Sequence, residues 1–229
     1  MTREVLHTPN FVADAAKFIH ARASEALSAR GQFRIALSGG NTPRPVYSEL
    51  AKMNLPWDQI FFTFGDERCV PPDDAESNFR MARESLFDLA RIPEKSIARM
   101  RGEIDPPIAA QEYAGELERI ASDGGEPVYR HDLILLGVGD DGHTASLFPG
   151  TAAVSERTRT VVANFVPRFN SWRITFTFPM INQARHICFL ANANKNAGLL
   201  DKVLGGDRQF PAAQVEPADG AITWILAEA

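Results

Sequence analysis

Cysteine is scarce in this sequence, with only Cys69 and Cys188 among 229 residues. Two cysteines cannot build a disulfide framework, and these two lack the CxxC spacing of a zinc or redox motif. Long hydrophobic runs are also missing, because no stretch reaches the roughly 18 apolar residues that span a bilayer. The N-terminal residues lack the basic region and apolar core of a signal peptide. We therefore expect a cytoplasmic protein with ordinary buried thiols and no membrane partner.

An excess of positive charge is absent as well. The formal net charge is -5 and the sequence pI is about 5.6. Nucleic acids and anionic membranes bind clustered Lys and Arg, so we expect no nucleic-acid partner. An anionic small substrate is still compatible with this charge, since a few cations and backbone N–H groups that converge on one pocket can hold a phosphate.

Short apolar runs alternate with helical patterns along the chain, and the length suits a single domain, residues 1–229, with room for a small lobe. We expect a monomer. The alternation predicts an α/β fold with an open, mostly parallel sheet and helices on both faces. The expected strands are 33–37, 60–64, 133–136, 161–165, 173–178, 187–191 and 222–226. The expected helices are 11–27, 43–50, 79–89 and 108–120.

Three of these strands run directly into polar loops that contain glycine. The loops read SGGNTP from Ser38, GDER from Gly65 and GVGDDGH from Gly137. Ligands of open parallel sheets bind beyond the carboxyl ends of the strands. We therefore expect the three loops to form one site.

The loop from Ser38 suits a phosphate group. It has small residues, two glycines that can adopt positive φ, and a helix start at Pro43 that Thr42 is expected to cap. The candidate phosphate ligands are Ser38, Gly39, Gly40, Asn41 and Thr42. A simple tight turn is the alternative, and the Gly-Lys-Ser/Thr of nucleoside triphosphate loops is absent.

The loop from Gly137 formally matches the GxGxxG pattern of dinucleotide-binding folds. Two features oppose a nicotinamide site. Asp140 and Asp141 would place carboxylates where the pyrophosphate should lie, and Pro149 interrupts the helix that should bind it.

His143 is the candidate general base. It directly follows a glycine-rich turn at a strand end, and Asp141 two residues earlier can orient or polarise its imidazole. A structural histidine is the alternative. HExxH motifs and His/Cys clusters with ligand spacing are absent, so we expect no metal and no cofactor.

Several charged residues are candidates for substrate contacts. Asp66 and Arg68 lie at a strand end, where a surface ion pair is the alternative. Arg168, Arg173 and Lys195 supply cations in the C-terminal third, and a helix that begins near Lys195 is an unfavourable place for a cation unless an anion lies nearby.

With these residues laid out, the sequence closely resembles the 6-phosphogluconolactonase family, a relative of the glucosamine-6-phosphate deaminases. The resemblance covers nearly the whole chain. The matching segments are LSGGNTPRPVY from Leu37, FFTFGDERCVPPDDAESNFRMARE from Phe61, LILLGVGDDGHTASLFPG from Leu133, RITFTFP from Arg173 and FLANANKNAGL from Phe189.

The resemblance implies a fold of the deaminase and ribose-5-phosphate isomerase type and places the catalytic histidine at His143. It implies hydrolysis of 6-phospho-D-glucono-1,5-lactone to 6-phosphogluconate in the oxidative pentose phosphate pathway. It also implies a phosphate site at the Gly39-Gly40 loop with Arg173 and Lys195, and an Arg68 that faces the substrate. We expect His143 to activate water, Asp141 to orient the imidazole and Arg68 to stabilise the oxyanion.

Two departures from the family pattern bear on the site. Family members often carry Pro-Lys and a further proline run before Arg173, where this chain has Pro167-Arg168. The related deaminases have Glu-Pro after the histidine turn where this chain has Phe148-Pro149, so a ring-opening acid is missing and lactone hydrolysis is favoured. The alternatives are a sugar-phosphate isomerase or deaminase of the same fold and a non-catalytic sugar-phosphate sensor.

Overall fold

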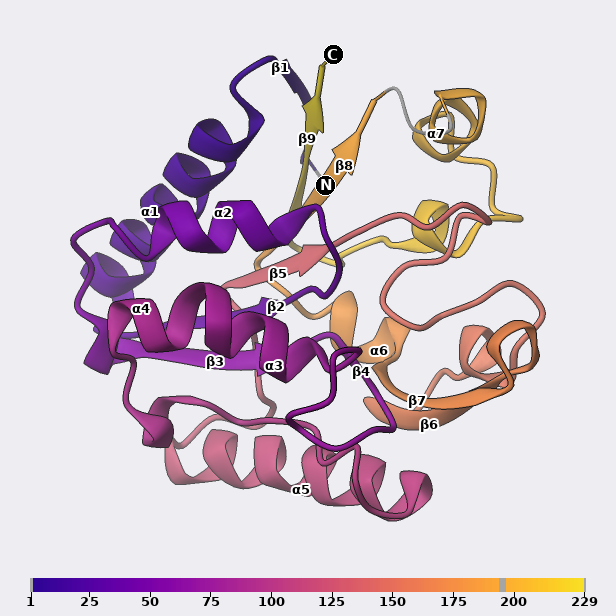
Figure 1. Cartoon of the computed structure of the whole chain (residues 1–229), viewed down its shortest axis with the longest axis horizontal. Helices are drawn as coiled ribbons and strands as arrows, with labels where there is room; N and C mark the ends of the chain where they lie inside the picture. The colour runs from indigo at the N-terminus through magenta and orange to yellow at the C-terminus, as the bar shows by residue number, and fades with distance from the viewer. Residues whose placement is uncertain (1, 194–196, 229) are drawn as a thin grey trace.

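The computed structural model describes residues 2–193 and 197–228, and its main layer is a parallel sheet of six strands in the order β1-β9-β8-β5-β2-β3 (Figure 1). Its strands are β1 (Thr2–Thr8), β2 (Phe33–Leu37), β3 (Ile60–Phe64), β5 (Leu133–Leu136), β8 (His186–Asn192) and β9 (Ala221–Ala227). The helices are α1 (Phe11–Arg30), α2 (Pro43–Leu50), α3 (Asn78–Ala82), α4 (Asp88–Ala90), α5 (Pro106–Asp123), α6 (Phe178–Ile181) and α7 (Ala197–Leu204). The α/β prediction is confirmed.

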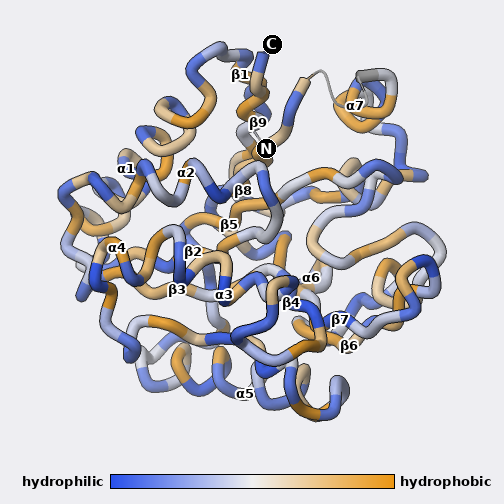
Figure 2. Tube along the Cα trace, in the orientation of Figure 1, coloured by the Kyte–Doolittle hydropathy of each residue, from blue (hydrophilic) through white to orange (hydrophobic). Residues whose placement is uncertain are grey.

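Alternate residues of the central strands supply two hydrophobic cores, one on each face of the sheet. Leu133 and Leu135 of β5 pack with α1 and α2, whereas Ile134 and Leu136 pack on the opposite side with α5. This is the pattern expected for strands buried on both faces. Figure 2 shows hydrophobic residues along the central strands and an alternation of hydrophobic and hydrophilic residues around α1 and α5.

The ends of the first two helices can be compared with the sequence. Helix α1 ends as expected at Gly31, which has φ 69° and donates its N–H to the carbonyl of Leu27. The prediction that Thr42 caps α2 is wrong. Thr42 has helical φ and ψ, and its side chain makes no capping hydrogen bond.

A second, smaller sheet is antiparallel, with the order β4-β7-β6. It consists of β4 (Asp66–Arg68), β6 (Val161–Val166) and β7 (Ser171–Phe176), and the 3₁₀ turn η5 (Pro167–Phe169) joins the last two. The GDER segment was expected as a loop, but its three charged residues form a short strand because they pair with β7. This small sheet lies beside the carboxyl ends of the strands of the main sheet (Figure 1).

Among the described residues no helix is long and apolar enough to cross a membrane. Both cysteines are free thiols. Cys188 is buried as expected, whereas Cys69 is only partly buried.

Candidate active site

The three loops singled out in the sequence meet around one cavity of about 470 Å³. It lies where β2, β5 and β8 end, beside the small sheet. Of the predicted site residues, those lining the cavity are Ser38, Gly39, Gly40, Asn41, Thr42, Asp66, Arg68, His143 and Arg173. The expectation that the loops converge at the carboxyl edge of the sheet is confirmed.

His143 and Asp141 form a hydrogen-bonded pair at one wall of the cavity. The Nδ1 atom of His143 lies 2.6 Å from Oδ1 of Asp141, and the backbone N–H of His143 donates to the same oxygen at 3.2 Å. Burial opposes ionisation of Asp141, but the hydrogen bonds and charge of His143 outweigh it and lower the pKa of this carboxyl. An ionised carboxylate only accepts, so Nδ1 carries a proton, and in the neutral form of the imidazole Nε2 is the atom with the lone pair.

Two close neighbours, Phe148 and Gly139, restrict the imidazole of His143. The ring of Phe148 stacks on it with centroids 4.0 Å apart and planes at 27°. Gly139 approaches so closely that a Cβ atom there would lie 1.9 Å from Cε1 of the imidazole. The GVGDDGH turn therefore needs glycine at Gly139, and the ring has little freedom to rotate away from the cavity.

The Ser38 loop is held by a buried tyrosine from α2. The hydroxyl of Tyr47 accepts from the backbone N–H of Ser38 at 3.0 Å and donates to its carbonyl at 2.8 Å. Gly39 packs against the side chain of Asn78, where a Cβ atom would lie 1.9 Å from Oδ1. Gly40 has φ 96°, a conformation that favours glycine. The loop thus exposes backbone and small side chains to the cavity.

Asp66 is buried at the base of the cavity and carries two hydrogen bonds to its carboxylate. The Ser146 hydroxyl donates to Oδ2 at 2.6 Å, and the Asn78 amide donates to Oδ1 at 3.3 Å. The carboxylate has acceptor capacity left for a substrate hydroxyl.

Arg68 and Arg173 face each other in register on β4 and β7. Their hydrogen bonds go to neutral groups, the Glu76 carbonyl for Arg68 and the Ser171 hydroxyl and Trp172 carbonyl for Arg173. Within residues 2–193 and 197–228 neither guanidinium forms an ion pair with a carboxylate. Burial first and the Arg68 charge second lower the pKa of Arg173. Two like charges placed opposite each other suit an anion bound between them.

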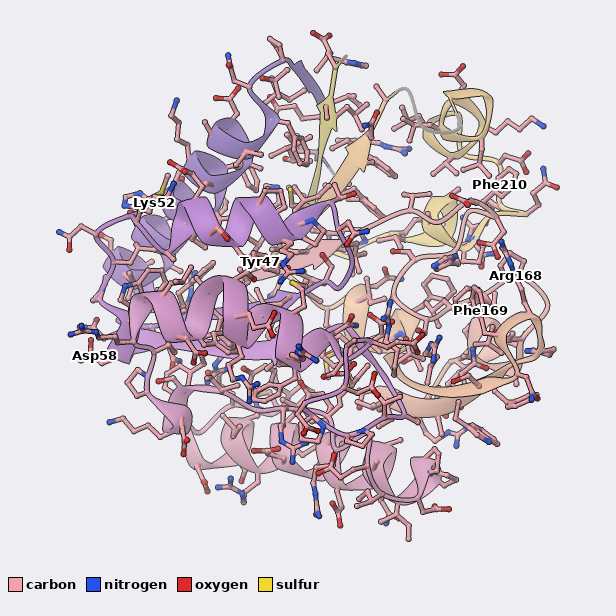
Figure 3. All side chains as sticks on the ribbon, viewed as in Figure 1. Tyr47, Lys52, Asp58, Arg168, Phe169 and Phe210 are labelled. Atoms are coloured by element: carbon pink, nitrogen blue, oxygen red, sulfur yellow. The ribbon has the colours of Figure 1, made fainter. Side chains whose placement is uncertain are left out.

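Arg168 lies differently from the other predicted cations. Its Nη1 atom is 3.3 Å from Oδ2 of Asp141, and its side chain does not line the cavity. Its neighbour Phe169 does line it. Figure 3 labels Arg168 and Phe169, and Cζ of Arg168 lies 5.3 Å from the centroid of the Phe169 ring. Lys195, the other predicted cation, lies outside the described residues.

Some cavity residues escaped the sequence reasoning, namely Glu76, Asn78, Ala145, Ser146 and Phe169. Asn78 had a weak signal, because the segment that contains it follows GDER directly. Phe169 had none, since its place depends on the β6–β7 turn. The remainder of the GVGDDG loop also differs from a dinucleotide fold, because no α-helix follows it within residues 144–160.

The arrangement joins a histidine, a buried carboxylate and two guanidinium groups around one cavity, and among the described residues neither guanidinium has a carboxylate partner. Groups of three or more His, Cys, Asp or Glu side chains that would suit a metal ion are not found in the described part of the chain. Such a site can bind an anionic polyhydroxyl compound and remove a proton from water beside it.

Comparisons with known proteins agree with this chemistry. Residues 7–224 match the family model described as glucosamine-6-phosphate isomerases/6-phosphogluconolactonase. The chain is 42% identical over 211 residues to a 6-phosphogluconolactonase of Synechocystis sp., and the alignment covers 90% of this chain and 86% of the relative. It is 34% identical to the enzyme of that name from Rattus norvegicus, with 95% and 87% covered.

Solved structures give the same result. A 6-phosphogluconolactonase structure from Thermotoga maritima aligns with a TM-score of 0.87 and 28% identity, covering 98% of this chain and 100% of that one. The enzyme of the same name from Trypanosoma brucei aligns with a TM-score of 0.80 and 28% identity, with 98% and 95% covered.

Proposed function

The chain belongs to the glucosamine-6-phosphate isomerase/6-phosphogluconolactonase family, and from this premise we infer that it hydrolyses 6-phospho-D-glucono-1,5-lactone to 6-phosphogluconate. This reaction places it in the oxidative pentose phosphate pathway. The observation that carries the proposal is the His143–Asp141 pair, because His143 lines the same cavity as Arg68 and Arg173, which have no carboxylate partner among the described residues. A cytoplasmic location and a monomeric state stay predictions from the sequence.

In the proposed mechanism, Nε2 of His143 takes a proton from water as the water oxygen attacks the lactone carbonyl. Asp141 keeps the proton on Nδ1 and stabilises the imidazolium. Arg68 stabilises the negative charge that develops on the carbonyl oxygen. The ring C–O bond then breaks, and the imidazolium returns its proton to the leaving ring oxygen, which becomes a hydroxyl of the product.

Substrate binding is assigned to the rest of the cavity. We propose that the Ser38–Thr42 backbone and Arg173 hold the phosphate, with Lys195 as a further cation, and that Asp66 accepts a hydrogen bond from a sugar hydroxyl. Phe148 supports hydrolysis over isomerisation or deamination. Its apolar ring stacks on His143 at the position where the pattern of the related deaminases has a glutamate.

The test is turnover of phosphogluconolactone by the purified protein, with spontaneous hydrolysis subtracted at each pH. We expect His143→Asn to lower turnover roughly 10²- to 10⁴-fold, the range of a positioned general base. The variant should still bind 6-phosphogluconate in calorimetry. His20→Asn on α1 is the matched control and should keep the wild-type rate.

Two results would contradict the proposal. Near-normal corrected turnover of His143→Asn would remove this histidine from the mechanism, and a wild-type protein that binds phosphogluconate without turnover would be a sensor.

The same assay after EDTA treatment should give an unchanged rate, because Nδ1 of His143 is occupied by Asp141 and the neighbouring described residues supply no further ligand set.

A further inference from the structure

The carboxylate of Asp141 has two different cationic partners. Its Oδ1 atom binds Nδ1 of His143 at 2.6 Å, and its Oδ2 atom lies 3.3 Å from Nη1 of Arg168. The sequence made Arg168 a candidate for a contact with the substrate. In the structure Arg168 does not line the cavity, and its guanidinium instead contacts the carboxylate oxygen of Asp141 that His143 does not use.

The turn that carries Arg168 is held against the base by packing. Phe169 contacts the edge of Phe148 with ring centroids 5.7 Å apart, and Phe148 in turn stacks on His143. Asn170 adopts φ 46° and donates its N–H to the Pro167 carbonyl, which closes the turn. The position of Arg168 next to Asp141 is therefore set by the fold of η5.

A carboxylate stabilises a neighbouring imidazolium, whereas a permanent positive charge close to that carboxylate opposes the effect. Other charges near the base face it from the cavity and belong to other elements: Asp66, Arg68, Glu76 and Arg173. Asp140 belongs to the same loop, and Asp207 and Arg208 precede Phe210, which packs on Gly142. Arg168 is distinguished from these groups by its direct contact with the orienting carboxylate.

We propose that Arg168 is a positioning residue that acts on His143 through Asp141 and keeps the imidazole unprotonated, and so able to act as base, down to lower pH. The inference rests on the proposed role of His143. In this proposal the η5 turn sets the pH range in which the enzyme works.

The experiment is the pH profile of kcat/KM for the wild type and for Arg168→Gln, Arg168→Lys and Arg168→Glu. In Arg168→Gln the fall of kcat/KM at low pH, the acid limb of the profile, should move to higher pH by roughly 0.3 to 1 unit. This is the size expected for one charge a few ångströms from Asp141 near a protein surface. Arg168→Lys should restore most of the wild-type profile, and Arg168→Glu should move the limb further. The difference between wild type and Arg168→Gln should shrink in molar salt, because the Arg168 side chain is 55% exposed.

Arg119→Gln is the matched control, since it removes one exposed arginine on α5 and should leave the profile unchanged. The titration of the His143 ring protons, followed by NMR and assigned with His143→Asn, reports the same shift without any turnover. It therefore separates a failure of this inference from a failure of the proposed activity. Asp141→Asn should reduce the effect of Arg168→Gln on that titration.

Two outcomes would overturn the inference. If Arg168→Gln and Arg168→Glu keep the wild-type acid limb and NMR titration but raise KM, Arg168 is a phosphate ligand. If Arg168→Lys shifts the limb as much as Arg168→Gln does, the guanidinium acts through packing and its charge is not responsible.

Discussion

Two arginines opposite each other on antiparallel strands, as Arg68 and Arg173 are, repel one another until an anion lies between them. Arg173 is only 9% exposed, so solvent screens its charge poorly. The free protein therefore keeps an unfavourable pair of charges. In the proposed mechanism the substrate relieves it, because its phosphate meets Arg173 and its developing oxyanion meets Arg68.

We expect Arg173→Ala to raise KM for the lactone roughly 10- to 150-fold, because it removes a charge-assisted contact worth about 1.5 to 3 kcal/mol. Turnover at saturation should change much less. Inorganic phosphate should raise the melting temperature of the wild type more than that of the variant. The control Arg159→Ala removes an exposed arginine beside β6 and should leave KM unchanged. If Arg173→Ala has the KM of the wild type, Arg173 is not a ligand of the phosphate.

Individual residues differ in how far the sequence reveals them. The place of His143 follows from one local pattern, a strand followed by a glycine turn, and does not depend on contacts with distant segments. Arg168 was assigned by its charge alone, but its partner depends on the geometry of the β6–β7 turn. Asn78 reaches Gly39 only because α3 folds back onto the loop, a contact between segments that no local pattern encodes.

At the scale of elements, Glu67 joins β4 to the start of α3. Its carboxylate accepts from the backbone N–H groups of Arg68, Asn78 and Phe79 at 2.7 to 2.8 Å, and from the Ser77 hydroxyl at 3.0 Å. Burial raises the pKa of Glu67, whereas the three backbone donors favour the carboxylate. All four partners act as donors, so the arrangement requires the ionised form.

Glu67→Gln should therefore destabilise the protein by about 1 to 3 kcal/mol, since an amide NH₂ group would meet donors in place of acceptors. KM should also rise, because α3 carries the Asn78 side chain that packs on Gly39. Urea unfolding and steady-state kinetics measure the two effects. Glu84→Gln, an exposed residue that pairs with Arg80, should change little by either measure, and a Glu67→Gln protein of wild-type stability would show that this clamp is unimportant.

The strands that the sequence predicted are those whose apolar runs reflect burial on both faces, such as β2 and β5. Two strands were missed for a common physical reason. β1 lies at the sheet edge with six of its seven residues exposed, and β4 is composed of charged residues. Their conformation comes from pairing with distant strands, so neither carries the local hydrophobic signal of a strand.

For the molecule as a whole, the most consequential buried titratable group outside the cavity is His131. Thr63 donates its hydroxyl hydrogen to the Ile35 carbonyl, so Nε2 of His131 donates to Thr63 at 2.9 Å and Nδ1 is left as a bare lone pair. Complete burial, with a smaller contribution from Arg34, lowers the pKa of His131 to about 3. Protonation would place a charged, unpartnered N–H in the core.

The unfolded chain binds this proton near the ordinary histidine pKa of about 6.5, and the folded chain does not. The contribution of His131 to stability is thus complete above that pH and is lost as the pH falls toward 3, by up to about 1.4 kcal/mol per pH unit. We expect His131→Gln to be less stable at pH 7 but to lose stability less steeply between pH 6 and pH 4. Urea unfolding at several pH values measures this slope. His20→Gln should keep the wild-type slope, and parallel slopes for His131→Gln and wild type would argue against the assignment.

The edge of the main sheet has a consequence for how the protein is made. β1 has a single neighbour in the sheet, β9, and Thr2 pairs with Ala221. A ribosome adds roughly 5 to 20 residues per second, so β1 waits tens of seconds before its partner strand is synthesised. During that time β1 has no partner in the sheet, so we expect the closing of this sheet edge to be among the last steps of folding.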